Sequence, residues 1–148
     1  MSAQILAGNY NASNVPQVGY VPWLASINYN GNGVTWAVID TGIDLTHPDL
    51  APNIIGGYSY TGCSTTGGND FAGGGHGTHV AGILAGLAIG NGTDAAADAN
   101  GFRYGQGVAP GTKLYSFSTV DCGAPWPPAG GWQELSKRGL AAGTQGAS

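Results

Sequence analysis

The sequence predicts an α/β fold in which a mainly parallel sheet is covered by helices. Residues 34–39 form an uncharged run rich in β-branched side chains, which is typical of a strand buried on both faces. Residues 113–117 alternate as a second strand should, and residues 132–142 have helical spacing. Between the two strands, apolar side chains recur at i, i+3, i+4 and i+7, as on one face of a helix: Val80, Ile83, Leu84 and Leu87. This order of strand, helix, strand and helix indicates layered α/β architecture.

Composition limits the classes of function. The chain has 148 residues, enough for one domain or part of one, and its 42% apolar content is adequate for a packed core. The net charge of −4 comes with no basic stripe, so we expect no nucleic-acid partner. The longest apolar stretch, residues 80–89, is interrupted by glycine and is shorter than the roughly 20 residues of a membrane span. We therefore expect no membrane partner, and residues 1–4 do not resemble a signal peptide.

The first candidate for chemistry is Asp40, directly after the strand predicted at 34–39. Open α/β sheets place their sites at the carboxyl ends of strands, and a carboxylate there is suited to orient an imidazole. Two alternatives stay open. Asp40 caps the following turn through backbone amides, or Asp40-Thr41-Gly42 is an aspartic-peptidase loop, which would require a dimer because the sequence contains this triplet once.

The second candidate is His76, at the start of a helix predicted over residues 76–89 and ended by Gly90-Asn91-Gly92. The positive end of a helix dipole favours the neutral imidazole that a general base requires. The face opposite the apolar one contains only alanine and glycine, so we expect the helix to be buried nearly all round. A purely structural role is an alternative, above all for His79. Zinc is disfavoured because no His-Glu-x-x-His motif is present, and a phosphate loop because no Lys-Ser/Thr follows the glycines.

The remaining segments are predicted to be mostly loop. Residues 52–75 lack a period and are expected to form loop or short irregular strand, and residues 91–107 form a polar loop. Residues 143–148 resemble a connection towards a further strand. Cys63 and Cys122 lie in loop-like sequence. The sequence is compatible with a disulfide between them and equally with two free thiols.

Three blocks in order make the sequence resemble the subtilisin-like serine proteases (subtilases, peptidase family S8). They are Val38-Ile39-Asp40-Thr41-Gly42-Ile43-Asp44 with His47-Pro48-Asp49-Leu50, then Gly75-His76-Gly77-Thr78-His79-Val80-Ala81-Gly82, then Gly107-Val108-Ala109-Pro110. The resemblance implies the N-terminal portion of a subtilisin-like three-layer α/β fold. It also implies a serine endopeptidase in which Asp40 is the orienting acid and His76 the general base. Polypeptide substrates and secretion are implied as well.

The family's nucleophile belongs to a Gly-Thr-Ser block, and none of the four Gly-Thr pairs in this chain is followed by serine. We therefore expect the chain alone to be inactive, with the missing C-terminal half of the catalytic domain as a partner. The alternative is a non-catalytic module that binds peptide or pairs with a serine-bearing chain. The expected organisation is an N-terminal extension (1–32), the Asp and His motif region (33–118), and a loop and helix leading to a missing strand (119–148).

Calcium is a further expectation from the resemblance. Family members often bind this ion between a position matching Asp49 and the loop after the histidine-bearing helix. Asp94, Asp98 and Asn100 offer hard oxygen ligands in that loop, although a solvated polar loop explains the same residues. Asp49 is the metal ligand that we predict.

Overall fold

A computed structural model describes residues 30–59, 68–70, 74–89, 105–119 and 131–147. Their centre is a four-stranded sheet in the order β2-β3-β1-β4. The strands are β1 (Thr35–Asp40), β2 (Ile54–Ser59), β3 (Lys113–Ser118) and β4 (Gly146–Ala147). Every pairing in the sheet is parallel, so β1, β2 and β3 end at the same edge. The parallel sheet confirms the predicted fold class.

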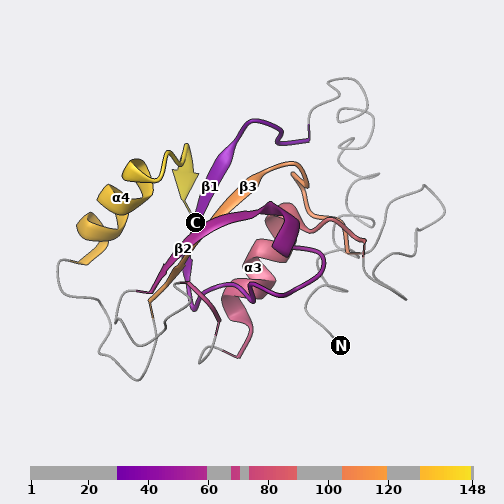
Figure 1. Ribbon diagram of the computed structural model, residues 1–148, viewed down its shortest axis with the longest axis horizontal. Coiled ribbons are helices and arrows are strands. Elements are labelled where there is room, and N and C mark those ends of the chain that lie inside the picture. Colours follow the sequence, from indigo (N-terminus) through magenta and orange to yellow (C-terminus); the bar gives the residue numbers. More distant parts are fainter. Residues whose placement is uncertain (1–29, 60–67, 71–73, 90–104, 120–130, 148) are drawn as a thin grey trace, which may run out of the picture.

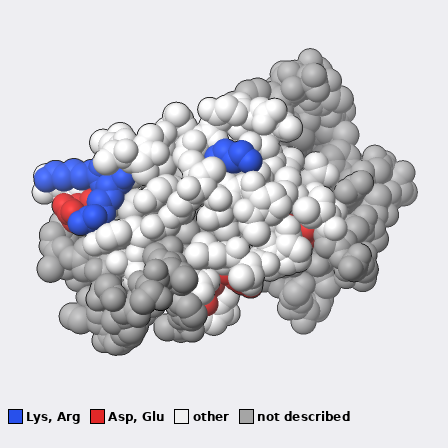
Figure 2. Space-filling model, viewed as in Figure 1, with Lys and Arg blue, Asp and Glu red and all other residues white. Residues whose placement is uncertain are grey.

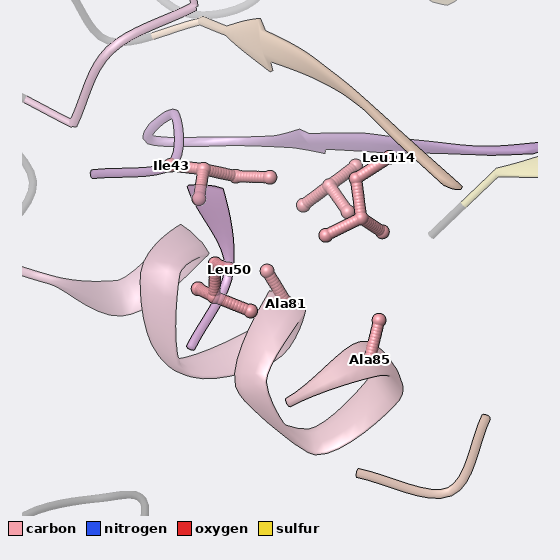
Figure 3. Packing of buried hydrophobic residues seen from close by; sticks show 6 residues of the cluster. Ile43, Leu50, Ala81, Ala85 and Leu114 are labelled. Atoms are coloured by element: carbon pink, nitrogen blue, oxygen red, sulfur yellow. The ribbon is translucent and has the colours of Figure 1, made fainter. Parts of the chain in front are cut away.

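The sheet lies between two helices, α3 (His76–Ala85) and α4 (Gly131–Ala141), as Figure 1 shows. On the α3 side, Val38 and Leu114 from the strands pack with helix residues Ala81 and Ala85. Figure 3 shows Leu114 on the side of the sheet that faces these two alanines. On the other side, Ala37 and Phe117 pack with Leu135 of α4. Successive residues of β1 thus point into different core clusters, which explains why the segment lacks polar alternation. Full burial of each Val or Leu contributes about 1.5–3 kcal/mol.

The strands at the centre of the sheet lie where the sequence placed them. β1 is shifted by one residue from the predicted 34–39, and β3 extends the predicted 113–117 by one residue. The strand β2 follows a short 3-10 helix, η1 (Ala51–Asn53), in a region expected to be loop or short irregular strand. Its pairing with β3 shifts register between Ile54 and Gly56, and this irregularity fits the absence of a period in its sequence.

The helix α3 ends at Ala85, so the predicted end at residue 89 was wrong. In a continuing helix the N–H of Leu87 would donate to the carbonyl of Ile83, but it donates to the backbone carbonyl of Asp49 (3.1 Å). The carbonyl of Ile83 accepts the N–H of Val108 (2.9 Å) instead. Tertiary hydrogen bonds with two other segments therefore end the helix before its apolar sequence ends.

The buried face of α3 also differs from the prediction of burial nearly all round. Gly77, Ala81, Gly82 and Ala85 are buried, whereas Ile83 is 39% exposed. Val80 and Leu84, from the face predicted to be apolar, are only partly buried against the core. Small side chains let a helix backbone approach the sheet closely. The close approach therefore selects the small-residue face for the core.

The helix α4 confirms the helical spacing over residues 132–142, and its Glu134 and Arg138 form an i, i+4 ion pair of 2.9 Å. Figure 2 shows that this view of the surface has few charged side chains and no stripe of basic ones. None of the described helices is long and apolar enough to cross a membrane. After α4 the chain enters the sheet at Gly146, so the further strand expected beyond residue 148 begins within the sequence as β4.

Candidate active site

Asp40 and His76 meet at the carboxyl end of β1. The Nδ1 atom of His76 lies 2.7 Å from Oδ1 and 2.9 Å from Oδ2 of Asp40. The two side chains differ in exposure: that of His76 is 66% exposed and that of Asp40 is 18% exposed. The structure therefore brings together the two residues that the sequence singled out, although they are 36 positions apart.

The position of Asp40 is fixed from several sides. Its Oδ1 also accepts the N–H of Thr41 (2.7 Å), so the turn-capping interaction considered from the sequence exists beside the contact with His76. Its backbone carbonyl accepts both the N–H and the hydroxyl of Thr119 (2.9 and 2.7 Å). The turn that follows requires Gly42, whose φ is +102° and whose added Cβ would lie 2.5 Å from the carbonyl oxygen of Asn69. These contacts hold the carboxylate at the strand end.

The first turn of α3 is held by residues distant in sequence. Its N-cap, Gly75, has a φ of +87° and makes no side-chain capping hydrogen bond. Instead, the N–H of Gly77 donates to Oγ1 of Thr41 (2.9 Å), and the N–H of Thr78 donates to Oδ2 of Asp70 (3.3 Å). The first N–H groups of a helix lack partners within the helix, so Thr41 and Asp70 act as its caps.

Asp40 raises the pKa of His76 above its usual range, first through the hydrogen bond and then through its charge, and the charge of Asp70 adds to this. Desolvation acts in the opposite direction, and the two carboxylates outweigh it. An ionised carboxylate only accepts hydrogen bonds, so Nδ1 of His76 carries the hydrogen. The neutral ring then offers Nε2 as the proton acceptor. An imidazole oriented in this way can take a proton from a nucleophile and hold the charge that results.

The predicted metal ligand, Asp49, lies away from this pair, on the segment that contacts the end of α3. Its side chain is 1% exposed, and Oδ1 accepts the N–H of Ile89 at 2.6 Å. No group of three or more His, Cys, Asp or Glu side chains suited to a metal occurs in the described part of the chain. The other ligands expected for calcium lie outside the described residues, as do both cysteines: Asp94, Asp98, Asn100, Cys63 and Cys122.

Sequence reasoning missed Thr41 and Asp70 as residues that hold the site. Thr41 stood inside a recognised motif, but nothing in the motif showed that its hydroxyl accepts a hydrogen bond from α3. Asp70 lies in a stretch without periodicity, and its link to Thr78 depends on the fold. A polar residue in such a stretch gives no signal by itself.

The chain matches the model of the subtilase family (Peptidase S8) over residues 31–127. It is 41% identical over 100 residues to subtilisin of Bacillus pumilus, covering 68% of this chain and 30% of that protein. It is also 41% identical over 100 residues to subtilisin E of Bacillus subtilis (strain 168), covering 68% of this chain and 22% of that protein.

Among solved structures, that of MycP1 with the N-terminal propeptide removed is similar, with a TM-score of 0.55 and 27% identity. The match covers 84% of this chain and 33% of that structure. The chain thus spans about a third or less of the length of these relatives. The family match extends over both Asp40 and His76 and over strands β1, β2 and β3. This chain belongs to the subtilase family of peptidases.

Proposed function

We propose that this chain provides the acid and the base of a serine endopeptidase, with Asp40 as the orienting acid and His76 as the general base. The single observation that supports this most is the contact of His76 Nδ1 with both carboxylate oxygens of Asp40, at 2.7 and 2.9 Å. In the reaction, His76 Nε2 would take the proton from a serine hydroxyl as the hydroxyl oxygen attacks the peptide carbonyl. Asp40 would stabilise the imidazolium that forms. His76 would then donate that proton to the leaving amine.

The nucleophile would come from residues outside these 148. The four Gly-Thr pairs are followed by His79, Asp94, Lys113 and Gln145, so the sequence contains no Gly-Thr-Ser. The geometry agrees with a contribution from elsewhere, because His76 is exposed and β4 is the last strand of the described sheet. An outer strand leaves backbone N–H and C=O groups available for a further strand. The 148-residue chain by itself would be inactive, and residues 33–118 would form its Asp and His motif region.

The same family membership supports polypeptides as substrates and the extracellular space as the place of action. The alternative proposal is a non-catalytic module that pairs with a serine-bearing chain or binds peptide. Both proposals share the Asp40–His76 pair, and they differ in whether a serine becomes reactive beside it.

Complementation tests the proposal. The 148-residue chain would be mixed with the segment of Bacillus pumilus subtilisin that follows the matched region, and labelled with a fluorophosphonate probe. We expect labelling of the added segment's serine with the wild-type chain, and loss of labelling with His76→Ala or Asp40→Ala. The matched control is Glu134→Gln on α4, which should label as the wild type does. Equal labelling with and without His76 would contradict the assigned role of the base.

Calcium at Asp49 belongs to the same proposal, although the described residues do not form a calcium site by themselves. Asp49 provides one carboxylate, and its Oδ1 already accepts a hydrogen bond from Ile89. No step of the reaction depends on the ion. Calcium would stabilise the segment after α3 if Asp49 is a ligand, so added calcium should raise the Tm of the wild-type chain and leave that of Asp49→Asn unchanged. An equal response of both chains would remove Asp49 from the calcium proposal.

A further inference from the structure

Asp70 is a carboxylate that the proposed reaction does not use, yet it contacts the helix turn that presents the base. Its Oδ2 accepts the hydroxyl of Thr78 at 2.7 Å and the N–H of Thr78 at 3.3 Å. Thr78 lies two residues after His76, within the first turn of α3. The hydroxyl of Thr78 in turn accepts the N–H of Asp44 at 2.8 Å. Thr78 therefore joins Asp70 to the loop that follows Asp40.

Asp70 is itself held by the backbone near the strand end. Its N–H donates to the carbonyl of Ile43 (3.2 Å), and Ile43 donates its own N–H to the carbonyl of Gly68 (2.9 Å). Residues 68–70 are thus tied to the same turn that follows Asp40. A carboxylate fixed in this way connects the turn after Asp40 to the first turn of α3. Hydrogen bonds from such fixed neighbouring residues determine how precisely a catalytic side chain is positioned.

The second oxygen of Asp70 has no visible structural use. Oδ1 is buried, and no hydrogen-bond donor reaches it from any residue that the structure describes. A buried polar atom without a partner costs about 1–3 kcal/mol, so a purely structural anchor for Thr78 would be served as well by a neutral side chain. The hydrogen bonds to Thr78 therefore do not require the negative charge, and the charge acts on the His76 ring.

We propose that Asp70 is a positioning residue of this site, which clamps the first turn of α3 through Thr78 and keeps His76 against Asp40. The inference rests on the proposed role of His76 as the base. The charge of Asp70 has a second effect, because it favours the protonated ring. The charged groups that act on the His76 ring are the carboxylates of Asp40 and Asp70, and both raise its pKa. Asp44 does not act on that ring: its own pKa is lowered, first by the hydrogen bond from Thr46 and to a smaller extent by His47. The other histidine on α3 is His79.

NMR titration of the full 148-residue chain tests the inference at low salt, where the charges are least screened. The histidine resonances would be assigned with His47→Gln and His79→Gln variants. Asp70→Asn keeps an oxygen acceptor for Thr78 and removes the charge, whereas Asp70→Ala removes both. We expect the His76 midpoint to fall in both variants. We expect hydrogen exchange of the Thr78 amide to accelerate only in Asp70→Ala. Glu134→Gln, the same loss of charge on α4, should change neither measurement.

A His76 midpoint and a Thr78 exchange rate that both match the wild type in Asp70→Ala would overturn the inference. The inference would also be overturned if Asp70→Ala lowered only the melting temperature, because a merely structural role would leave the titration of His76 unchanged. If Asp70→Ala does not fold, the inference is tested with Asp70→Asn and with two variants of Thr78. Thr78→Val removes the hydroxyl that donates to Asp70, so we expect faster amide exchange at residue 78. Thr78→Ser keeps the hydroxyl, so we expect the exchange rate of the wild type. Asp40→Asn provides the separate test of the proposed function: an unchanged midpoint there contradicts the Asp40–His76 pair and leaves the Asp70 measurements to be judged independently.

Discussion

Gly77 lies directly against the carbonyl oxygen of Gly42, and a Cβ atom added to Gly77 would overlap that oxygen. The same Cβ would lie 3.1 Å from the Cβ of Asp40. The absence of a side chain at Gly77 therefore sets how closely α3 approaches the turn after β1. Because His76 is the neighbouring residue, this approach brings its ring within hydrogen-bonding distance of Asp40.

Replacing Gly77 with alanine should separate the helix from the turn. The new methyl group meets backbone atoms, which cannot move aside as a flexible side chain would, so we expect a loss of about 1–3 kcal/mol in the free energy of unfolding. Urea denaturation monitored by circular dichroism measures this loss. Gly139→Ala on α4 is the matched control, since its Cβ would meet Oγ1 of Thr144 at 3.2 Å and the Cβ of Ala37 at 3.8 Å.

We expect Gly139→Ala to range from neutral to a gain of about 1 kcal/mol, because alanine favours the helix over glycine. The comparison isolates the close approach at Gly77 from the general effect of adding a methyl group to a helix. Equal unfolding free energies for the two variants would show that Gly42 and Gly77 do not limit the packing of α3.

The stability of the chain should depend on pH through His76. The folded state raises the pKa of this side chain above the ordinary value of 6.5 because of its contact with Asp40. A raised folded-state pKa means that the folded state binds the proton more tightly. The stabilisation is therefore complete below pH 6.5 and is lost as the pH rises through the folded-state value. Denaturant melts should show this decline in the wild type and a flatter profile in His76→Gln, at pH values where the carboxylates remain ionised. Parallel profiles for the two chains would argue against a stabilising contact.

Ser116 should contribute to the stability of the turn after Asp40. Its hydroxyl accepts the N–H of Ile43 (3.0 Å) and donates to the carbonyl of Gly68 (2.6 Å), and the residue is fully buried. Ser116→Ala removes both hydrogen bonds and should cost about 1–3 kcal/mol. The cost should fall in the lower part of this range, because the N–H of Ile43 also donates to the carbonyl of Gly68.

The control for Ser116 is Ser118→Ala, which removes a single hydrogen bond from the Ser118 hydroxyl to the carbonyl of Thr41 (2.9 Å). We expect the smaller loss of thermal stability for this variant when the two melting curves are compared. The reverse order would mean that the hydroxyl of Ser116 is not the main tether between β3 and the turn.

The sequence was sufficient to predict the elements whose own residues determine them. The strand β1 is an uncharged run rich in β-branched residues, and β3 is a segment of alternating character. Both lie within one residue of the predicted bounds. The start of α3 at His76 was also predicted correctly. The end of α3 was not, because it depends on hydrogen bonds from Val108 and to Asp49, which are distant in sequence.

The candidate site shows the same division. Asp40 and His76 were found because each belongs to a recognisable block and each stands at the end of a predictable element. Thr41 and Asp70, which cap α3 from other segments, were not found because their partners are set by tertiary contacts. Burial of the small-residue face of α3 likewise required the approach of Gly42 to Gly77, which no periodicity of the helix reveals.

The ring tautomer of His76 tests the central claim most directly. The ¹⁵N chemical shifts of its two ring nitrogens would be measured in the 148-residue chain at a pH above its pKa, with Asp40→Asn for comparison. We expect the hydrogen on Nδ1 and an unprotonated Nε2, because the carboxylate of Asp40 accepts a hydrogen bond from Nδ1. A ring that carries its hydrogen on Nε2, with shifts unaffected by Asp40→Asn, would contradict the pairing on which the proposed peptidase site depends.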